Sequence, residues 1–250
     1  MASHSDKNDK KPGLRGRAAT VGLDKAQIVN AAIEQIDQRG LAAFSMRELA
    51  RTLGVSPAVI YWHVGGRQED LFAEVSAVIT AALTDDFEPD QGWQERLRSV
   101  FRRYRYLVHQ HPRVAPLLGA QMKSNGVANL VWVETVLAAL AEAGFEGESL
   151  RDAFNVLIGG LSGFVTMELA PPPADDSSGW QQTFADRVAS FDAEQFPHTH
   201  AVLPLISNRI FVLRWQNGAD VSYDSSFEML LDIIIDGLAQ RAPRSDNTGG

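Results

Sequence analysis

The sequence predicts an all-α protein in which an N-terminal helix-turn-helix unit of three helices precedes a larger helical domain. Apolar residues recur at the i, i+3, i+4, i+7 spacing of amphipathic helices, as at Val29, Ala32, Ile33 and Ile36. Ser or Asp residues before such segments and Gly residues after them are helix start and stop signals. The chain has 250 residues, 45% of them hydrophobic, which is enough for one large domain or two smaller ones.

The composition excludes several kinds of chemistry. The chain contains no Cys, so it can form no disulfide, thiolate nucleophile or Cys-ligated zinc site. The N-terminal stretch lacks the apolar segment of a secretory signal, and the least polar stretch, 153–167, is shorter than the ~18 residues expected of a membrane span. We therefore expect a cytoplasmic protein with no membrane partner.

The net charge of -8 is unevenly distributed. Residues 1–67 contain ten Lys/Arg and six Asp/Glu (+4), whereas residues 68–250 contain thirteen and twenty-five (-12). A polyanion would be attracted to the first part and repelled by the second. Residues 1–22 are predicted to be a disordered basic arm, either a solubilising leader or a segment that contacts DNA phosphates or a minor groove. Residues 243–250 are predicted to be a disordered tail.

Local signals define the first two helices. Asp24 can cap the first, and Gly40 stands where a C-terminal glycine belongs. Ser45 and Glu48 have the spacing of a capping box, in which each side chain accepts a hydrogen bond from the other residue's backbone N–H. The second helix then ends at Gly54, after about two turns.

The third helix begins after Ser56, a predicted cap, with Pro57 in the first helical position. The pair Gly65-Gly66 ends it. We expect these three helices to form one domain over residues 23–68.

The same signals predict a second helical domain over residues 69–242. Its expected helices cover 67–83, 93–109, 112–121, 127–143, 150–169 after a cap at Ser149, and 226–240 after a capping box at Ser225 to Glu228. The segments 84–92 and 171–179 are predicted loops. The apolar run RIFVLRW, 209–215, could be a strand or a buried helix, and we favour a helix because no partner strand is evident.

The segment SMRELARTLGVSPAVIYWHVGGR, 45–67, holds the candidate site. Its apolar positions would form the core of a helix-turn-helix unit, which leaves aromatic and basic side chains pointing outward. Small residues at the start of the third helix would allow close approach to a major groove, and the later polar and aromatic residues could contact phosphates. Alternatively, the unit is only a packing module and the aromatic rings fold under the next helix.

The stretch MRELARTLGVSPAVIYWHVGGRQEDLFAEV closely resembles the DNA-binding domain of the TetR family of bacterial transcription regulators. The resemblance implies DNA-contacting roles for Arg47, Ser56, Pro57, Ala58, Val59, Tyr61, Trp62, His63 and Arg67. Relatives carry larger polar residues at the start of this helix, so the small residues at 56–58 imply a different operator sequence.

The rest of the chain resembles, through scattered short matches, the C-terminal domain of the tetracycline-repressor subgroup. This resemblance implies a homodimer formed through helices 150–169 and 226–240 that binds double-stranded operator DNA, most simply as a repressor that a small molecule releases. Tetracycline repressors hold a magnesium-drug chelate partly through a His on the connecting helix. Here no His lies between His63 and His109, and Leu83 is near the matching place, so we expect a different inducer.

The inducer is expected to be a small apolar or amphipathic molecule of unknown identity, with no cofactor. Candidate pocket residues are the aromatic and polar side chains Phe101, Tyr104, His109, Trp132, Asn155, Phe164 and Glu168.

Of three alternative functions, the residues argue against two. Gly160-Leu161-Ser162-Gly163 lacks the G-x-S-x-G pattern of a hydrolase nucleophile and lies in a helical segment, so no enzyme is expected. The pairs His109/His111 and His198/His200 diverge by about 200° on a helix, so no metal site is expected. A helical interaction or small-molecule-binding protein without specific DNA binding is the remaining alternative.

Overall fold

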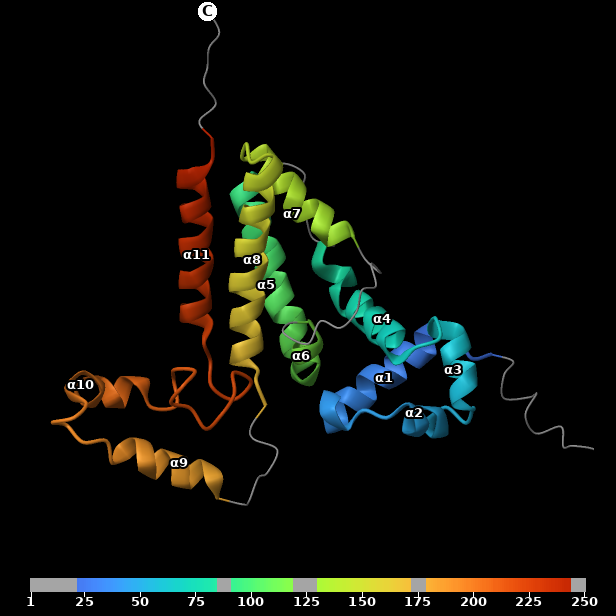
Figure 1. The fold of residues 1–250 in the computed structure, drawn as a ribbon, viewed down its shortest axis with the longest axis horizontal. Helices are drawn as coiled ribbons and strands as arrows, with labels where there is room; N and C mark the ends of the chain where they lie inside the picture. The colour runs from blue at the N-terminus through green and yellow to red at the C-terminus, as the bar shows by residue number, and fades with distance from the viewer. Residues whose placement is uncertain (1–21, 85–90, 119–129, 172–178, 244–250) are drawn as a thin grey trace, which may run out of the picture.

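The computed structural model describes residues 22–84, 91–118, 130–171 and 179–243, and within these ranges the chain forms helices and turns but no strand (Figure 1). The all-α prediction is therefore confirmed for the described part of the chain. Most of the predicted basic arm (1–22), of the predicted C-terminal tail (243–250) and of the loops predicted at 84–92 and 171–179 lies outside the described residues.

The N-terminal helices are α1 (Lys25–Arg39), α2 (Met46–Thr52), α3 (Pro57–Val64) and α4 (Gln68–Ala81), with 3-10 turns η1 (Leu41–Ala43) and η2 (Ala82–Thr84). The later helices are α5 (Trp93–Gln110), α6 (Ala115–Leu118), α7 (Val131–Glu142), α8 (Gly147–Glu168), α9 (Trp180–Ala189), α10 (Pro197–Ile206) and α11 (Asp224–Arg241), with η3 (Pro112–Val114) between α5 and α6. The predicted α1 to α5 agree closely with these bounds.

Two predicted caps differ in the structure of the N-terminal unit. Ser45 caps α2 by accepting a bond from the Glu48 N–H at 3.5 Å, but the Glu48 carboxylate pairs with Arg39 and Arg51 instead of completing a capping box. Two nearby guanidinium groups are stronger partners for a carboxylate than one backbone N–H. Ser56 occupies the cap position of α3, but its side chain makes no capping bond.

Two later helices begin earlier than predicted. Glu146 caps α8, and Ser149, the predicted cap, is three residues inside, where its hydroxyl accepts the Glu146 N–H at 3.1 Å. A capping box therefore forms one turn before the cap that the sequence predicts. α11 starts at Asp224, two residues before the predicted start, and the predicted capping box at Ser225 does not form because Ser225 already lies within the helix.

The apolar run 209–215 is neither helix nor strand, so the predicted helix there was wrong. Asn208 adopts a left-handed backbone conformation with φ 58°, which turns the chain after α10. Its side-chain oxygen then accepts the N–H groups of Trp215 and Gln216, at 3.0 and 3.1 Å. One polar side chain thus closes the run into a loop, which apolar periodicity does not reveal.

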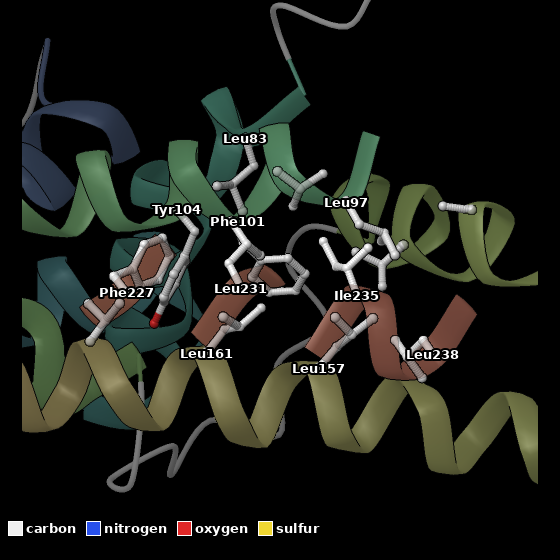
Figure 2. Packing of buried hydrophobic residues seen from close by; sticks show 14 of the residues in the cluster. Leu83, Leu97, Phe101, Tyr104, Leu157, Leu161, Phe227, Leu231, Ile235 and Leu238 are labelled. Carbon is white, nitrogen blue, oxygen red and sulfur yellow. The ribbon is translucent and has the colours of Figure 1, made fainter. Parts of the chain in front are cut away.

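Buried side chains form two clusters. The first holds α1 to α4 together, and Val114 of η3 and Leu117 of α6 belong to it. The second lies between α5, α7, α8 and α11, and Figure 2 shows Phe101, Leu161 and Leu231 meeting there from three helices. The three-helix unit therefore packs against η3 and α6 of the second domain.

Helices α8 and α11 run side by side in opposite directions (Figure 1). A Cβ on Gly160 would lie 2.7 Å from Ile234 Cδ1, so the glycine permits this close approach. Helices α9 and α10 lie away from this pair, and α10 contributes no buried residue.

Candidate functional site

Helix α3 has one buried side and one exposed side. Ile60 and Val64 are buried in the first cluster, and Tyr61 packs partly against it. Trp62 is 81% exposed, and its ring meets that of His63 edge-on, with centroids 4.7 Å apart. Because most of the indole stays in contact with solvent and stabilises the fold little, Trp62 is available for contact with another molecule.

All nine sequence-predicted DNA-contacting residues lie on or partly at the surface. Arg47, Ser56, Ala58, Trp62 and Arg67 are exposed, and Pro57, Val59, Tyr61 and His63 are half-buried. Tyr61 therefore serves the core as well as the surface, and its replacement would change both.

Arg67 lies at the start of α4, directly after the glycine turn that ends α3. Its guanidinium is 3.0 Å from Asp70 Oδ1, and its backbone N–H donates to Asp70 Oδ2 at 2.9 Å. The hydrogen bond from the Arg67 side chain holds the pKa of Asp70 below its ordinary value. This pair fixes an exposed cation beside the outer side of α3.

The seven predicted ligand residues do not form one group. Phe101 and Tyr104 are buried in the second cluster, with Trp132 and Phe164 packed against it. His109 and Glu168 face each other, with Nε2 and Oε1 3.3 Å apart. Asn155 is exposed on α8.

Glu168 is the centre of a buried polar cluster that the sequence did not reveal in full. Its side chain is 0% exposed and accepts two bonds from Arg105, at 3.0 and 2.6 Å. Arg105 also contacts Asp224 of α11 at 2.7 Å. Burial opposes the ionisation of Glu168, but His109 and Arg105 outweigh it, so the pKa of this carboxyl lies below its ordinary value.

Aromatic side chains surround this polar cluster. The Phe164 ring lies 5.0 Å from Phe211 and 5.7 Å from Phe227, and Phe211 lies 5.1 Å from Tyr223. Arg105 stacks over Phe227 with its guanidinium carbon 5.0 Å from the ring centre. The loop after α10 thus covers the C-terminal end of α8 with aromatic rings.

Gly218 ties the same loop to α8. Its N–H donates to the Glu168 carbonyl at 2.7 Å, and an added Cβ would lie 2.1 Å from Glu168 Cγ. We expect Gly218→Ala to lower the free energy of unfolding by about 1–3 kcal/mol and to expose the loop 207–223, measured by urea denaturation and limited proteolysis. As a control, Gly92→Ala, which meets nothing within 4 Å, should cost less than about 1 kcal/mol. An equal loss in the two variants would contradict the docking of this loop.

Outside these two sites, a shallow groove of about 550 Å³ lies on the outer side of α11 and is lined by Met229, Asp232, Ile233, Asp236, Gly237 and Gln240. In the described part of the chain, no group of three or more His, Asp or Glu side chains could hold a metal ion. No helix among the described residues is long and apolar enough to cross a membrane.

Sequence reasoning missed Arg105, Phe211, Arg214 and Tyr223. Arg105 is four residues before His109 on α5, so the sequence could have placed these two on one face. Arg214 donates to the Glu168 carbonyl, 46 positions away. Only the folded chain brings such distant groups together.

Comparison with known proteins covers both parts of the chain. Residues 28–75 match the family described as bacterial regulatory proteins, tetR family, and residues 87–242 match the tetracyclin repressor-like C-terminal domain. The class A tetracycline repressor from transposon 1721 of Escherichia coli is 26% identical, with 88% of this chain and 92% of that protein aligned. The transcriptional repressor DrrR1 of Streptomyces coeruleorubidus is also 26% identical, over 90% of this chain and 79% of its own.

A solved structure is also similar to this chain over most of its length. The TetR family protein ActR of Streptomyces coelicolor, in complex with actinorhodin, aligns with a TM-score of 0.65 and 25% identity over 89% of this chain and 99% of its own. The fold and the exposed side of α3 define a helix-turn-helix transcription regulator. The chain belongs to the TetR family, which consists of transcription regulators and not of enzymes.

Proposed function

We propose that the protein is a repressor that binds a pseudo-palindromic operator as a homodimer and is released by a small molecule in its second domain. The observation that carries this proposal is the outer side of α3, where Trp62 is 81% exposed on a helix anchored by the buried Ile60. A large aromatic group held in this way on a rigid helix suits contact with a partner better than it suits the fold.

The nine surface residues divide by their chemistry. Ser56, Pro57, Ala58 and Val59, at the start of α3, are small enough to approach base edges, where Val59 would meet a thymine methyl group. The remaining residues, with polar or aromatic tips, would contact phosphates and fix the position of α3: Arg47, Tyr61, Trp62, His63 and Arg67.

The domain 23–68 would bind DNA, and the domain 69–242 would form the dimer and bind the inducer. Two-fold pairing through α8 and α11 would place two recognition helices about 34–36 Å apart, one turn of DNA. Exposed apolar residues on these helices support such pairing: Val156 is 54%, Met229 65% and Ile233 63% exposed. The excess of acidic groups after residue 67 would keep DNA on one side.

The inducer would bind in the second domain near the aromatic and polar residues Phe101, Tyr104, His109, Trp132, Asn155, Phe164 and Glu168. It would release the operator by favouring a state in which α4 is tilted, which requires different affinities for the two states. The apolar side chains that pack around these residues favour an apolar or amphipathic inducer. The relatives named for tetracycline and bound to actinorhodin are consistent with a ring-containing molecule.

A salt titration tests DNA binding directly. Duplexes are selected from a random library by the protein, and the affinity for the selected duplex is measured by fluorescence anisotropy. We expect two inverted half-sites and an affinity whose logarithm falls linearly with log[salt], by about 0.9 per phosphate contacted. The alternative, a helical protein without specific DNA binding, predicts that no sequence is enriched. Absence of any binding at low salt would refute the proposal.

A further inference from the structure

We propose that Asp37, His111 and Arg113 form a domain clasp that sets the orientation of the three-helix unit on the second domain and thereby its affinity for the operator. The proposal rests on the proposed function for its effect on DNA binding. The clasp joins residues that are 74 to 76 positions apart in the sequence.

The contacts of the clasp converge on the last turn of α1. His111 Nδ1 lies 2.7 Å from Asp37 Oδ2. Arg113 Nη1 donates to the carbonyl groups of Asp37, at 3.1 Å, and Gln38. The end of a helix carries free carbonyls and a partial negative charge, which favours a cation at this place.

Apolar residues support the same contact from below. Val114 and Leu117 are 0% and 2% exposed, and they pack into the first cluster beside α1 and α4. Apolar attraction is non-directional, whereas hydrogen bonds require a particular geometry of donor and acceptor. The clasp would therefore set the orientation, and the apolar contacts of Val114 and Leu117 would stabilise the interface between the two domains.

The last turn of α5 and the residue after it connect the clasp to the buried polar cluster. His109 is in the last turn of α5, and His111 is the first residue after the helix, with a non-helical backbone (φ -132°, ψ 63°). His109 lies 3.3 Å from Glu168 in the second domain, while His111 faces Asp37 in the three-helix unit. A displacement of the C-terminal end of α8 would move the end of α5 and reach α1 through His111.

His109 and His111 are therefore positioning residues, because they link the Glu168 cluster of the second domain to α1 of the three-helix unit. In a dimer, both recognition helices must match the groove spacing at once, so a wider spread of domain orientations lowers affinity. We expect the loss of the clasp to weaken operator binding about tenfold, within the usual range of coupling between sites.

Distance measurements with spin labels test the clasp. The chain has no Cys, so Thr52→Cys on α2 and Glu134→Cys on α7 place two labels on exposed sites of the two domains. Labelled protein is diluted with unlabelled protein, and the distance distribution is measured by pulsed electron resonance. His111→Gln and Asp37→Asn should each broaden the distribution and weaken binding of the selected duplex, and the double variant should be no worse than either.

Glu48→Gln is the matched control. It weakens the pairs of Glu48 with Arg39 of α1 and Arg51 of α2, which lie inside the three-helix unit, and should leave the distribution unchanged. If Asp37→Asn does not fold, Arg113→Gln removes the two carbonyl contacts instead and carries the same expectation. An unchanged distribution and an affinity within about twofold for folded His111→Gln would overturn the clasp. Failure of the unaltered protein to bind DNA would overturn the proposed function, while the distances would still test the clasp.

Discussion

Replacing Trp62 with Ala is expected to weaken operator binding about tenfold and to leave the folded protein intact. The indole is 81% exposed, so its removal takes little apolar area out of the core. A contact to DNA is typically worth about 1–3 kcal/mol, and 1.4 kcal/mol corresponds to a factor of ten. Anisotropy with the selected duplex measures the first effect and urea denaturation the second.

Tyr106→Ala is the matched control for this variant. Tyr106 is also an exposed aromatic residue, 55% accessible, but it lies on α5 in the second domain. Its truncation should leave operator affinity within about twofold. If Trp62→Ala bound as tightly as the control, or lost stability by several kcal/mol, the outer side of α3 would not be the DNA-contacting surface.

The largest expected effect on stability follows from Arg105→Leu. Glu168 is fully buried and Arg105 is 14% exposed, so the change leaves a buried carboxylate without its main partner. Breaking a buried ion pair from one side costs about 3–5 kcal/mol. The double variant Arg105→Leu/Glu168→Leu should regain part of this loss, because an apolar pair of similar volume needs no counter-charge.

Arg51→Leu provides the exposed comparison. The pair of Arg51 and Glu48 has side chains 76% and 22% accessible, so its loss should change the free energy of unfolding by less than about 1 kcal/mol. Equal losses in Arg51→Leu and Arg105→Leu, measured by urea denaturation, would show that burial of the Arg105 pair contributes nothing.

The same cluster predicts a pH dependence with a defined sign. The folded-state pKa of Glu168 is below its ordinary value of 4.5, so the ionised carboxylate stabilises the fold above that pH. The stability advantage over Glu168→Gln should be constant at neutral pH and should fall as the pH drops below about 4.5. An advantage that grew on acidification would contradict the contacts of Glu168.

Short-range signals explain why α1 to α3 could be placed from the sequence. Asp24, Ser45 and Pro57 act within one helical turn, so their effect does not depend on the rest of the fold. The capping box at Glu48 failed because Arg39 and Arg51 compete for its carboxylate. The helix expected at 209–215 failed because Asn208 binds backbone groups seven and eight residues away.

The sequence by itself determined the all-α class, the helix-turn-helix unit and the residues on the outer side of α3, because helix periodicity and capping are local. Only the tertiary structure decided the partners of Glu168, the division of the predicted ligand residues and the contact of His111 with Asp37. These depend on groups that lie tens of residues apart and meet only when α1, α5, α8 and the loop after α10 are packed. Periodicity assigns a side chain to a face, but it does not specify which distant group will lie opposite it.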